Sequence, residues 1–210
     1  MRGLSGTLRK IRGEYGVTMM ELIVILGVLS VLAAILAPMV INYLDDAKKQ
    51  KALSDVMTLQ GTILRLTKDV GHFPLYKDGT QTTGKLDWEL LQGPGNDPQD
   101  HDSKKWLNAQ GKTDDLENHL IKNNPGSKKY ETDPTKSRFL WRGPYMELIG
   151  VDPWGNRYLV NIKNADPADN PAKVVWVLTA GPNGKIETDP DSLADSGALP
   201  VNDDIAVRIK

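Results

Sequence analysis

One stretch near the start of the chain constrains its fold more than any other, the apolar run from Leu22 to Ile41. These twenty residues carry no charged side chain, and Ser30 is the one polar residue among them. A helix of this length, at ~1.5 Å per residue, is about 30 Å long, which matches the hydrocarbon core of a bilayer. The run therefore predicts a membrane-spanning helix.

An acidic residue, Glu21, stands at the edge of this run. A carboxylate close to lipid is costly unless a positive group accompanies it. The preceding segment, 1–16, is rich in arginine and lysine, as a cytoplasmic leader is, and it ends in Gly16. A cut after Gly16 frees the amino group of Val17, four residues before Glu21 and on the same helix face. If the leader 1–16 were removed by such a cut, the cut would create the positive partner of Glu21.

The order of residues around this position resembles the class III signal of type IV pilins and type II secretion pseudopilins. It reads Gly16-Val17-Thr18-Met19-Met20-Glu21-Leu22, then the apolar run with Pro38 inside it. The resemblance implies that a prepilin peptidase cleaves after Gly16 and methylates Val17. It also implies that Glu21 acts in filament assembly and that Pro38 distorts the helix. The chain departs from the family in one respect, because the first mature residue is usually phenylalanine and here is valine.

Two other interpretations of the apolar run fit less well. A secretory signal peptide has a shorter apolar core and a small-x-small cleavage site, whereas here Ala37 is followed directly by Pro38. An uncleaved signal anchor accounts for the basic leader and the apolar run. It leaves the position of Glu21 and its spacing from Gly16 unexplained.

The helix is expected to continue beyond the membrane, from about Val17 to Val70. Segment 17–42 forms the membrane or filament-core half, in which Pro38 is expected to kink or loosen the helix. Segment 43–70 becomes amphipathic, with apolar residues recurring every three or four positions. Gly71 and Pro74 then favour a helix end.

The remaining residues are enough for one modest globular head. Segment 71–150 is predicted to be a variable region of loops and short helices, the latter at 86–91 and 113–121. Segment 151–210 is predicted to form an antiparallel sheet with strands at 157–163, 173–180 and 204–209. A turn, Asp152-Pro153-Trp154-Gly155-Asn156-Arg157-Tyr158, precedes it and resembles the major pseudopilins of type II secretion, the general secretion pathway protein G class. The expected fold is α+β and type IV pilin-like, a long N-terminal helix packed on a small antiparallel sheet.

A loop with many acids joins the last two predicted strands. It begins at Gly181-Pro182-Asn183-Gly184 and ends at Asn202-Asp203-Asp204. Neighbouring carboxylates repel unless a cation neutralises them, and ligands that are all oxygen suit Ca²⁺. The major pseudopilins hold calcium with a related pair of segments. The expected ligands are Asn183, Asp203 and Asp204, with the Leu178 carbonyl as a further candidate. The alternative is an acidic, solvated loop.

The sequence thus predicts a structural subunit rather than an enzyme, since it contains neither a nucleophile paired with a base nor a phosphate-binding loop. The predicted role is a type II secretion pseudopilin in a homo-oligomeric filament. Its expected partners are other minor pilins or pseudopilins, the prepilin peptidase and an inner-membrane assembly platform, with the head in the periplasm. A type IV pilin and a membrane-tethered periplasmic binding module are the alternatives. The net charge of −1 indicates no nucleic-acid surface, and the absence of cysteine excludes disulfides.

Overall fold

The computed structural model describes residues 16–75, 87–100, 106–107, 111–166, 173–193 and 197–210. The predicted leader, apart from Gly16, lies outside the described residues. The chain divides into two compact units, one up to Asp45 and one from Asp46 onward. The finer segment boundaries predicted from the sequence stay predictions.

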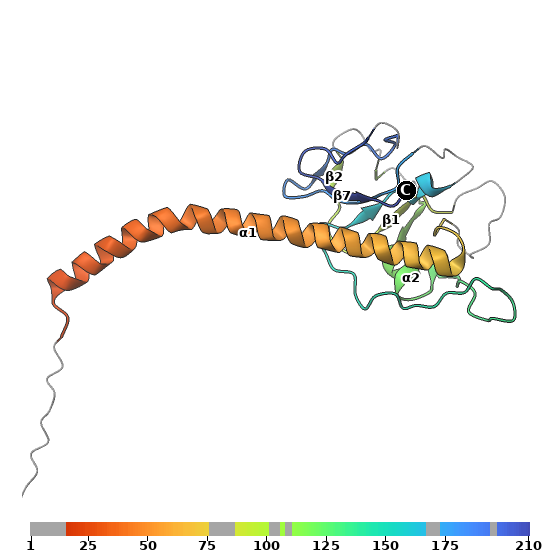
Figure 1. The fold of residues 1–210 in the computed structure, drawn as a ribbon, viewed down its shortest axis with the longest axis horizontal. Helices are drawn as coiled ribbons and strands as arrows, with labels where there is room; N and C mark the ends of the chain where they lie inside the picture. The colour runs from red at the N-terminus through yellow and green to blue at the C-terminus, as the bar shows by residue number, and fades with distance from the viewer. Residues whose placement is uncertain (1–15, 76–86, 101–105, 108–110, 167–172, 194–196) are drawn as a thin grey trace, which may run out of the picture. The chain divides into compact units, whose positions relative to one another are not determined.

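A single helix, α1 (Met19–Val70), runs through 52 residues and confirms the long helix expected from the sequence (Figure 1). It continues through Pro38 without ending. At its C-terminal end the Gly71 amide donates to the Thr67 carbonyl over 2.9 Å. Gly71 has a φ of 83°, a left-handed conformation that glycine adopts without strain.

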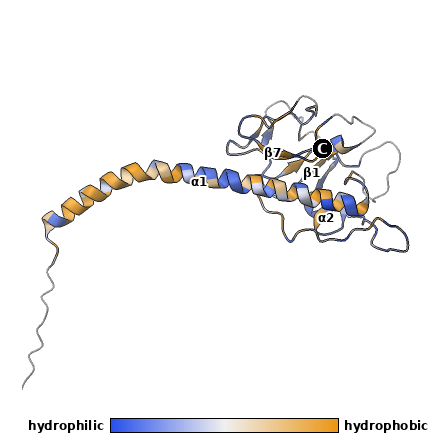
Figure 2. Ribbon diagram, viewed as in Figure 1, coloured by the Kyte–Doolittle hydropathy of each residue, from blue (hydrophilic) through white to orange (hydrophobic). Residues whose placement is uncertain are grey.

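The first part of α1 is apolar on all sides, as Figure 2 shows by its orange colour. Its length and composition are sufficient to cross a membrane, and none of its most apolar stretch is buried within the molecule. The hydroxyl of Ser30 donates to the Leu26 carbonyl over 2.7 Å. The one polar side chain of the run is thereby satisfied by the helix itself, as a residue facing lipid requires.

From residue 46 onward α1 has one buried face. Its buried residues recur every three or four positions, so they line a single stripe of the helix. They are Ala52, Val56, Leu59, Ile63, Leu66 and Val70. Apolar residues of the sheet and of its flanking segments cover this stripe and complete the main core of the head, among them Leu91, Val160, Val175 and Val177.

The head contains a sheet of five strands in the order β3-β1-β4-β5-β7. These are β3 (Thr113–Asp115), β1 (Leu90–Gln92), β4 (Leu159–Val160), β5 (Trp176–Thr179) and β7 (Ile205–Arg208). A second sheet pairs β2 (Gln99–Asp100) with β6 (Lys185–Ile186). The α+β class is confirmed, and β4, β5 and β7 pair antiparallel within the three predicted strand regions.

Two details of the variable region differ from the sequence prediction. The helix predicted at 86–91 is wrong over its described residues, because Leu90 and Leu91 begin β1. Both are buried, since the sheet has a covered surface on each side. Within the helix predicted at 113–121, only the part that forms α2 (Leu116–Leu120) is helical. The preceding residues form β3, which pairs parallel with β1 and makes the sheet mixed.

The second surface of the sheet has its own apolar cluster. It contains the alternate residues of the strands, whose side chains point away from α1. The buried members are Leu90, Trp106, Leu159, Val174, Trp176, Leu178, Ala180 and Ile186. Short 3-10 turns, Pro125–Ser127 and Ile162–Ala165, complete the described regular structure.

Candidate functional site

The peptide bond between Gly16 and Val17 lies just before α1 and outside any regular structure. Gly16 to Thr18 are exposed, and the exposed fraction of Val17 is 65%. A side chain built on Gly16 would meet no other group within 4 Å. Among the described residues, therefore, nothing shields this bond from a protease.

Thr18 caps the start of the helix. Its hydroxyl oxygen accepts from the Glu21 amide over 3.2 Å, and its carbonyl accepts from the Leu22 amide over 3.1 Å. Glu21 lies in the first turn of α1, where the helix dipole favours a negative charge. This cap was not predicted from the sequence, although Thr18-x-x-Glu21 is a capping-box pattern. Because Thr18 follows Val17, the cap survives a cut after Gly16.

The Asp152–Tyr158 turn is organised by the carboxylate of Asp152, which is 2% exposed. One oxygen, Oδ1, accepts from the amides of Trp154 over 2.9 Å and Asn156 over 2.7 Å. The other, Oδ2, accepts from the hydroxyl of Thr179 at the end of β5. This single side chain therefore closes the turn and ties it to the sheet.

The two ends of the acidic loop meet at Asn183. Its side-chain amide donates to Asp203 Oδ1 over 2.6 Å and to Glu187 Oε1 over 2.9 Å. Its main-chain amide donates to Asp203 Oδ2 over 3.0 Å. Gly181 has a φ of 64°, and a Cβ on it would lie 2.1 Å from the Asp203 carbonyl oxygen. Only glycine permits this close approach.

Asp204 is buried beside this junction and holds the strand that leaves it. Its Oδ2 accepts from the amides of Glu187 over 3.0 Å and Thr188 over 2.7 Å. Asp204 Oδ1 and Glu187 Oε2 are buried and have no hydrogen-bond partner. Burial raises the pKa of Asp204, against the opposing effect of the Thr188 and Glu187 hydrogen bonds. Two unpartnered carboxylate oxygens are suited to a cation.

The predicted calcium ligands are brought together only in part. Asn183 and Asp203 are in contact, and Asp204 is linked to them through Glu187. Leu178 lies within β5, paired with Leu159 and Ala206. In the part of the chain that the structure describes, no three acidic, histidine or cysteine side chains form a metal cluster. The chemistry of the donors nevertheless suits Ca²⁺, which also binds amide and main-chain oxygens.

A buried polar cluster lies within the variable region, 71–150, and was not predicted from the sequence. His119 is fully buried, with Nδ1 2.6 Å from the Tyr130 hydroxyl and Nε2 3.2 Å from Asp114 Oδ2. Burial raises the pKa of Asp114, but hydrogen bonds from His119 and Asn118 outweigh it and hold that pKa below its ordinary value. This burial favours a structural role for His119.

Comparison with known proteins gives three relatives with the same description. The chain is 23% identical over 178 residues to the type II secretion system core protein G of Escherichia coli (strain K12), covering 85% of this chain and 88% of that protein. It is 27% identical over 85 residues to the protein so described in Klebsiella pneumoniae, covering 40% of this chain and 56% of that protein. It is 31% identical over 68 residues to the protein so described in Dickeya chrysanthemi, covering 32% of this chain and 44% of that protein.

No family model matches the chain, and no solved structure matches it. The three relatives nevertheless agree with one another and with the fold. They confirm that the chain resembles the type II secretion pseudopilins, as its sequence predicts.

Proposed function

We propose that the chain is a structural subunit of a type II secretion pseudopilus, processed after Gly16 and methylated at Val17. The observation that carries the proposal is the start of α1: an exposed Gly16–Val17 bond, a capped helix and Glu21 in its first turn. The descriptions of the three relatives favour secretion over a type IV pilus.

Assembly follows from the exposed apolar surface of α1. Before assembly this surface faces lipid in the inner membrane, with the head in the periplasm. In a filament the same surface is covered by the helices of neighbouring copies. Glu21 then balances the amino group of Val17, on its own chain or on a neighbour, and neither charge remains unpaired in an apolar core.

The proposed partners are those of a filament subunit. They comprise further copies of this chain, minor pseudopilins, a prepilin peptidase that cuts after Gly16 and an inner-membrane assembly platform. The role is structural and requires no catalytic residue.

Calcium is proposed to reinforce the acidic loop, with Asn183, Asp203, Asp204 and Glu187 as its side-chain ligands and the Leu178 carbonyl as the remaining candidate. A bound cation would neutralise adjacent carboxylates and join the two ends of a long loop that no disulfide closes. The support is the pair of buried, unpartnered oxygens on Asp204 and Glu187.

The test begins with the intact mass of the protein extracted from native membranes. We expect a chain that begins at Val17 and carries one added methyl group. A chain that retains Met1 contradicts the proposal. Gly16→Val should leave the leader in place, whereas the control Gly27→Ala, inside the helix, should be processed normally.

Assembly is tested with Glu21→Ala in the cells that produce the protein. We expect processing to continue, while filaments and the release of secreted proteins fall at least tenfold. The matched control is Glu147→Ala, which removes an exposed acid of the head. Normal filaments from Glu21→Ala refute the proposed role of the carboxylate. Loss of long surface fibres without loss of secretion would assign the chain to a type IV pilus instead.

A further inference from the structure

The acidic loop 181–204, whose described residues are blue in Figure 1, is fastened at its middle as well as at its two ends. The carbonyl of Ser192 accepts from the Val174 amide over 3.0 Å, and Leu193 pairs antiparallel with Lys173. Both contacts are made just before β5 begins, at the opposite end of that strand from the two ends of the loop. The middle of the loop is therefore attached to the head independently of its ends.

Two buried asparagines secure this middle. The side-chain amide of Asn161 donates to the Pro190 carbonyl over 2.6 Å, and that of Asn164 donates to the same carbonyl over 2.7 Å. Both also donate to the Val174 carbonyl, over 3.1 and 2.9 Å. Asn161 in addition accepts from the Trp176 amide of β5 over 2.6 Å. The asparagines are 2% and 5% exposed, so water does not readily replace these bonds.

The one acid at this attachment has its charge balanced. Asp191 Oδ1 lies 3.4 Å from the ammonium nitrogen of Lys163 and 3.2 Å from that of Lys173. Burial raises the pKa of Asp191, but the two lysines outweigh it and hold that pKa below its ordinary value. The attachment therefore requires no metal ion. We call it the latch; it comprises Asn161, Asn164, Lys163, Lys173, Val174 and segment 190–193.

The two ends of the loop are joined in a different way, at what we call the end junction: Asn183, Glu187, Thr188, Asp203 and Asp204. The partners of its two aspartates are main-chain and side-chain amides rather than lysine or arginine, within the residues that the structure describes. Buried oxygens of Asp204 and Glu187 have no hydrogen-bond partner. Neighbouring carboxylates that no cation balances repel one another, which weakens the end junction but not the latch.

We propose that the latch holds the loop on the head without calcium, and that calcium orders only the end junction. The proposal rests on the calcium binding proposed above and limits what the ion does. Once the middle of the loop is attached, each remaining part is shorter, and closing a shorter loop costs less conformational entropy. The sheet and the latch therefore form before a cation binds, and the end junction alone responds to it.

Amide hydrogen exchange of the full-length chain in detergent, with millimolar calcium or with EGTA, tests this division. Exchange of a hydrogen-bonded amide reports how often its part of the structure opens. The reporters are the amides of Glu187 and Thr188 at the end junction and that of Val174 at the latch, each of which donates a bond described above. Removal of calcium should speed exchange at least tenfold at the end junction and less than twofold at Val174.

The result separates the two proposals. Equal acceleration at all three amides means that the loop opens as one unit, which overturns the latch and leaves calcium binding intact. Exchange that calcium changes at none of them overturns calcium binding, and with it the division proposed here.

Asn164→Ala tests the latch apart from calcium. Asn164 is the better target because the side chain of Asn161 also orders β5. In saturating calcium, Asn164→Ala should speed exchange of the Val174 amide at least tenfold and that of the Glu187 amide less than twofold. The control Asn124→Ala replaces an exposed asparagine and should change neither. Exchange at Val174 that matches the control overturns the latch.

Asp191→Asn gives a second measurement that leaves the buried asparagines in place. It removes the charge that pairs with Lys163 and Lys173 and should speed exchange of the Val174 amide at least threefold. Glu147→Gln, which removes an exposed acid elsewhere on the head, is its control. Equal exchange at Val174 in the two variants overturns the role of these ion pairs in the latch.

Discussion

Replacing Asp152 with alanine tests whether one carboxylate holds the turn before the sheet. Its two oxygens accept from the amides of Trp154 and Asn156 and from the hydroxyl of Thr179. The side chain is 2% exposed, so water does not readily replace the lost acceptor. Alanine therefore leaves two amides and one hydroxyl without their partner in a closed site.

The expected loss of unfolding free energy is large. A hydrogen bond to a charged group contributes about 1.5–3 kcal/mol, and such contributions are not additive. We therefore expect Asp152→Ala to cost roughly 3–5 kcal/mol, a large part of the ~5–15 kcal/mol of a typical domain. Asp152→Asn keeps one carbonyl oxygen for the two amides and should cost only about 1–2 kcal/mol.

The assay is urea unfolding of the full-length chain in detergent, followed by tryptophan fluorescence. Trp154 lies within the turn and is one of the five tryptophans that contribute to this signal. Glu147→Ala is the control, because it removes an exposed acid from the same segment and should change the free energy by less than about 0.5 kcal/mol. The proposed role of the Asp152 carboxylate is refuted if Asp152→Ala is no less stable than Asp152→Asn, or if its stability matches that of the control.

Three further measurements follow from buried polar groups. Tyr158→Phe removes the hydroxyl that donates to Asp55 and should lower the free energy of unfolding by about 1 kcal/mol in the same assay. Hydrogen bonds hold the pKa of Asp114 below its ordinary value, so its contribution to stability is complete above about pH 4 and is lost as pH falls through the folded pKa. Asp114→Asn should flatten the acid limb of a stability–pH curve. Burial raises the pKa of Asp204, so without calcium stability should fall as pH rises from about 4 through the folded pKa. At pH 7 millimolar calcium should raise the unfolding temperature, and Asp204→Asn should abolish that rise.

The sequence was sufficient to predict features that depend on local order. The span of α1 follows from continuous apolar residues, and its end follows from Gly71 and Pro74. Strand β5 follows from its β-branched and aromatic residues. Strand β1 was missed because adjacent leucines, Leu90 and Leu91, fit one turn of a helix equally well. Only the sheet, which has a covered surface on each side, explains why both are buried.

The candidate sites also divide into features that local sequence predicts and features that depend on the packing of distant segments. Thr18 could have been predicted as a cap, because its partner Glu21 is three residues away. The meeting of Asn183 with Asp203 was expected only through the family resemblance. The acceptor role of Asp152 toward Thr179 and the link from Asp204 to Glu187 depend on how distant segments pack. Local patterns carry no information on such pairs.

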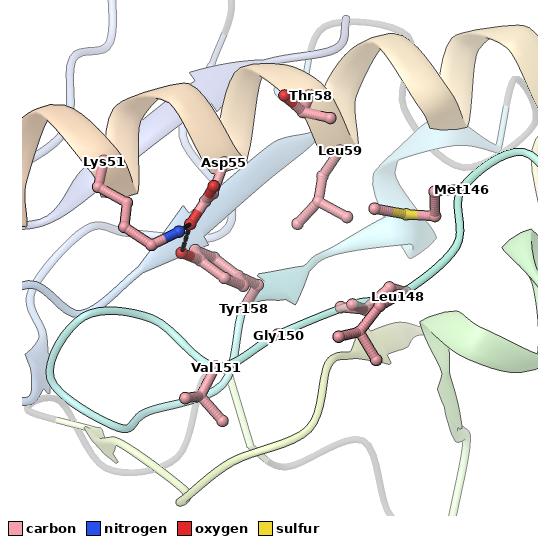
Figure 3. A pocket seen from close by; sticks show the side chains of 10 residues that line it. Lys51, Asp55, Thr58, Leu59, Met146, Leu148, Gly150, Val151 and Tyr158 are labelled. Carbon is pink, nitrogen blue, oxygen red and sulfur yellow. Dashed lines mark hydrogen bonds and ion pairs between the residues drawn. The ribbon is translucent and has the colours of Figure 1, made fainter.

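The segment 146–151, which lines a pocket with α1 (Figure 3), depends on two fixed points. Between Ile121 and Tyr158, a stretch that the structure describes throughout, no segment joins the five-stranded sheet. The part 146–151 is instead held by the buried side chain of Ile149 and, immediately after it, by the carboxylate of Asp152. Loss of that carboxylate should free the segment 146–151 before it unfolds the head. Asp152→Ala should therefore speed amide hydrogen exchange in 146–151 even at temperatures where the sheet remains intact.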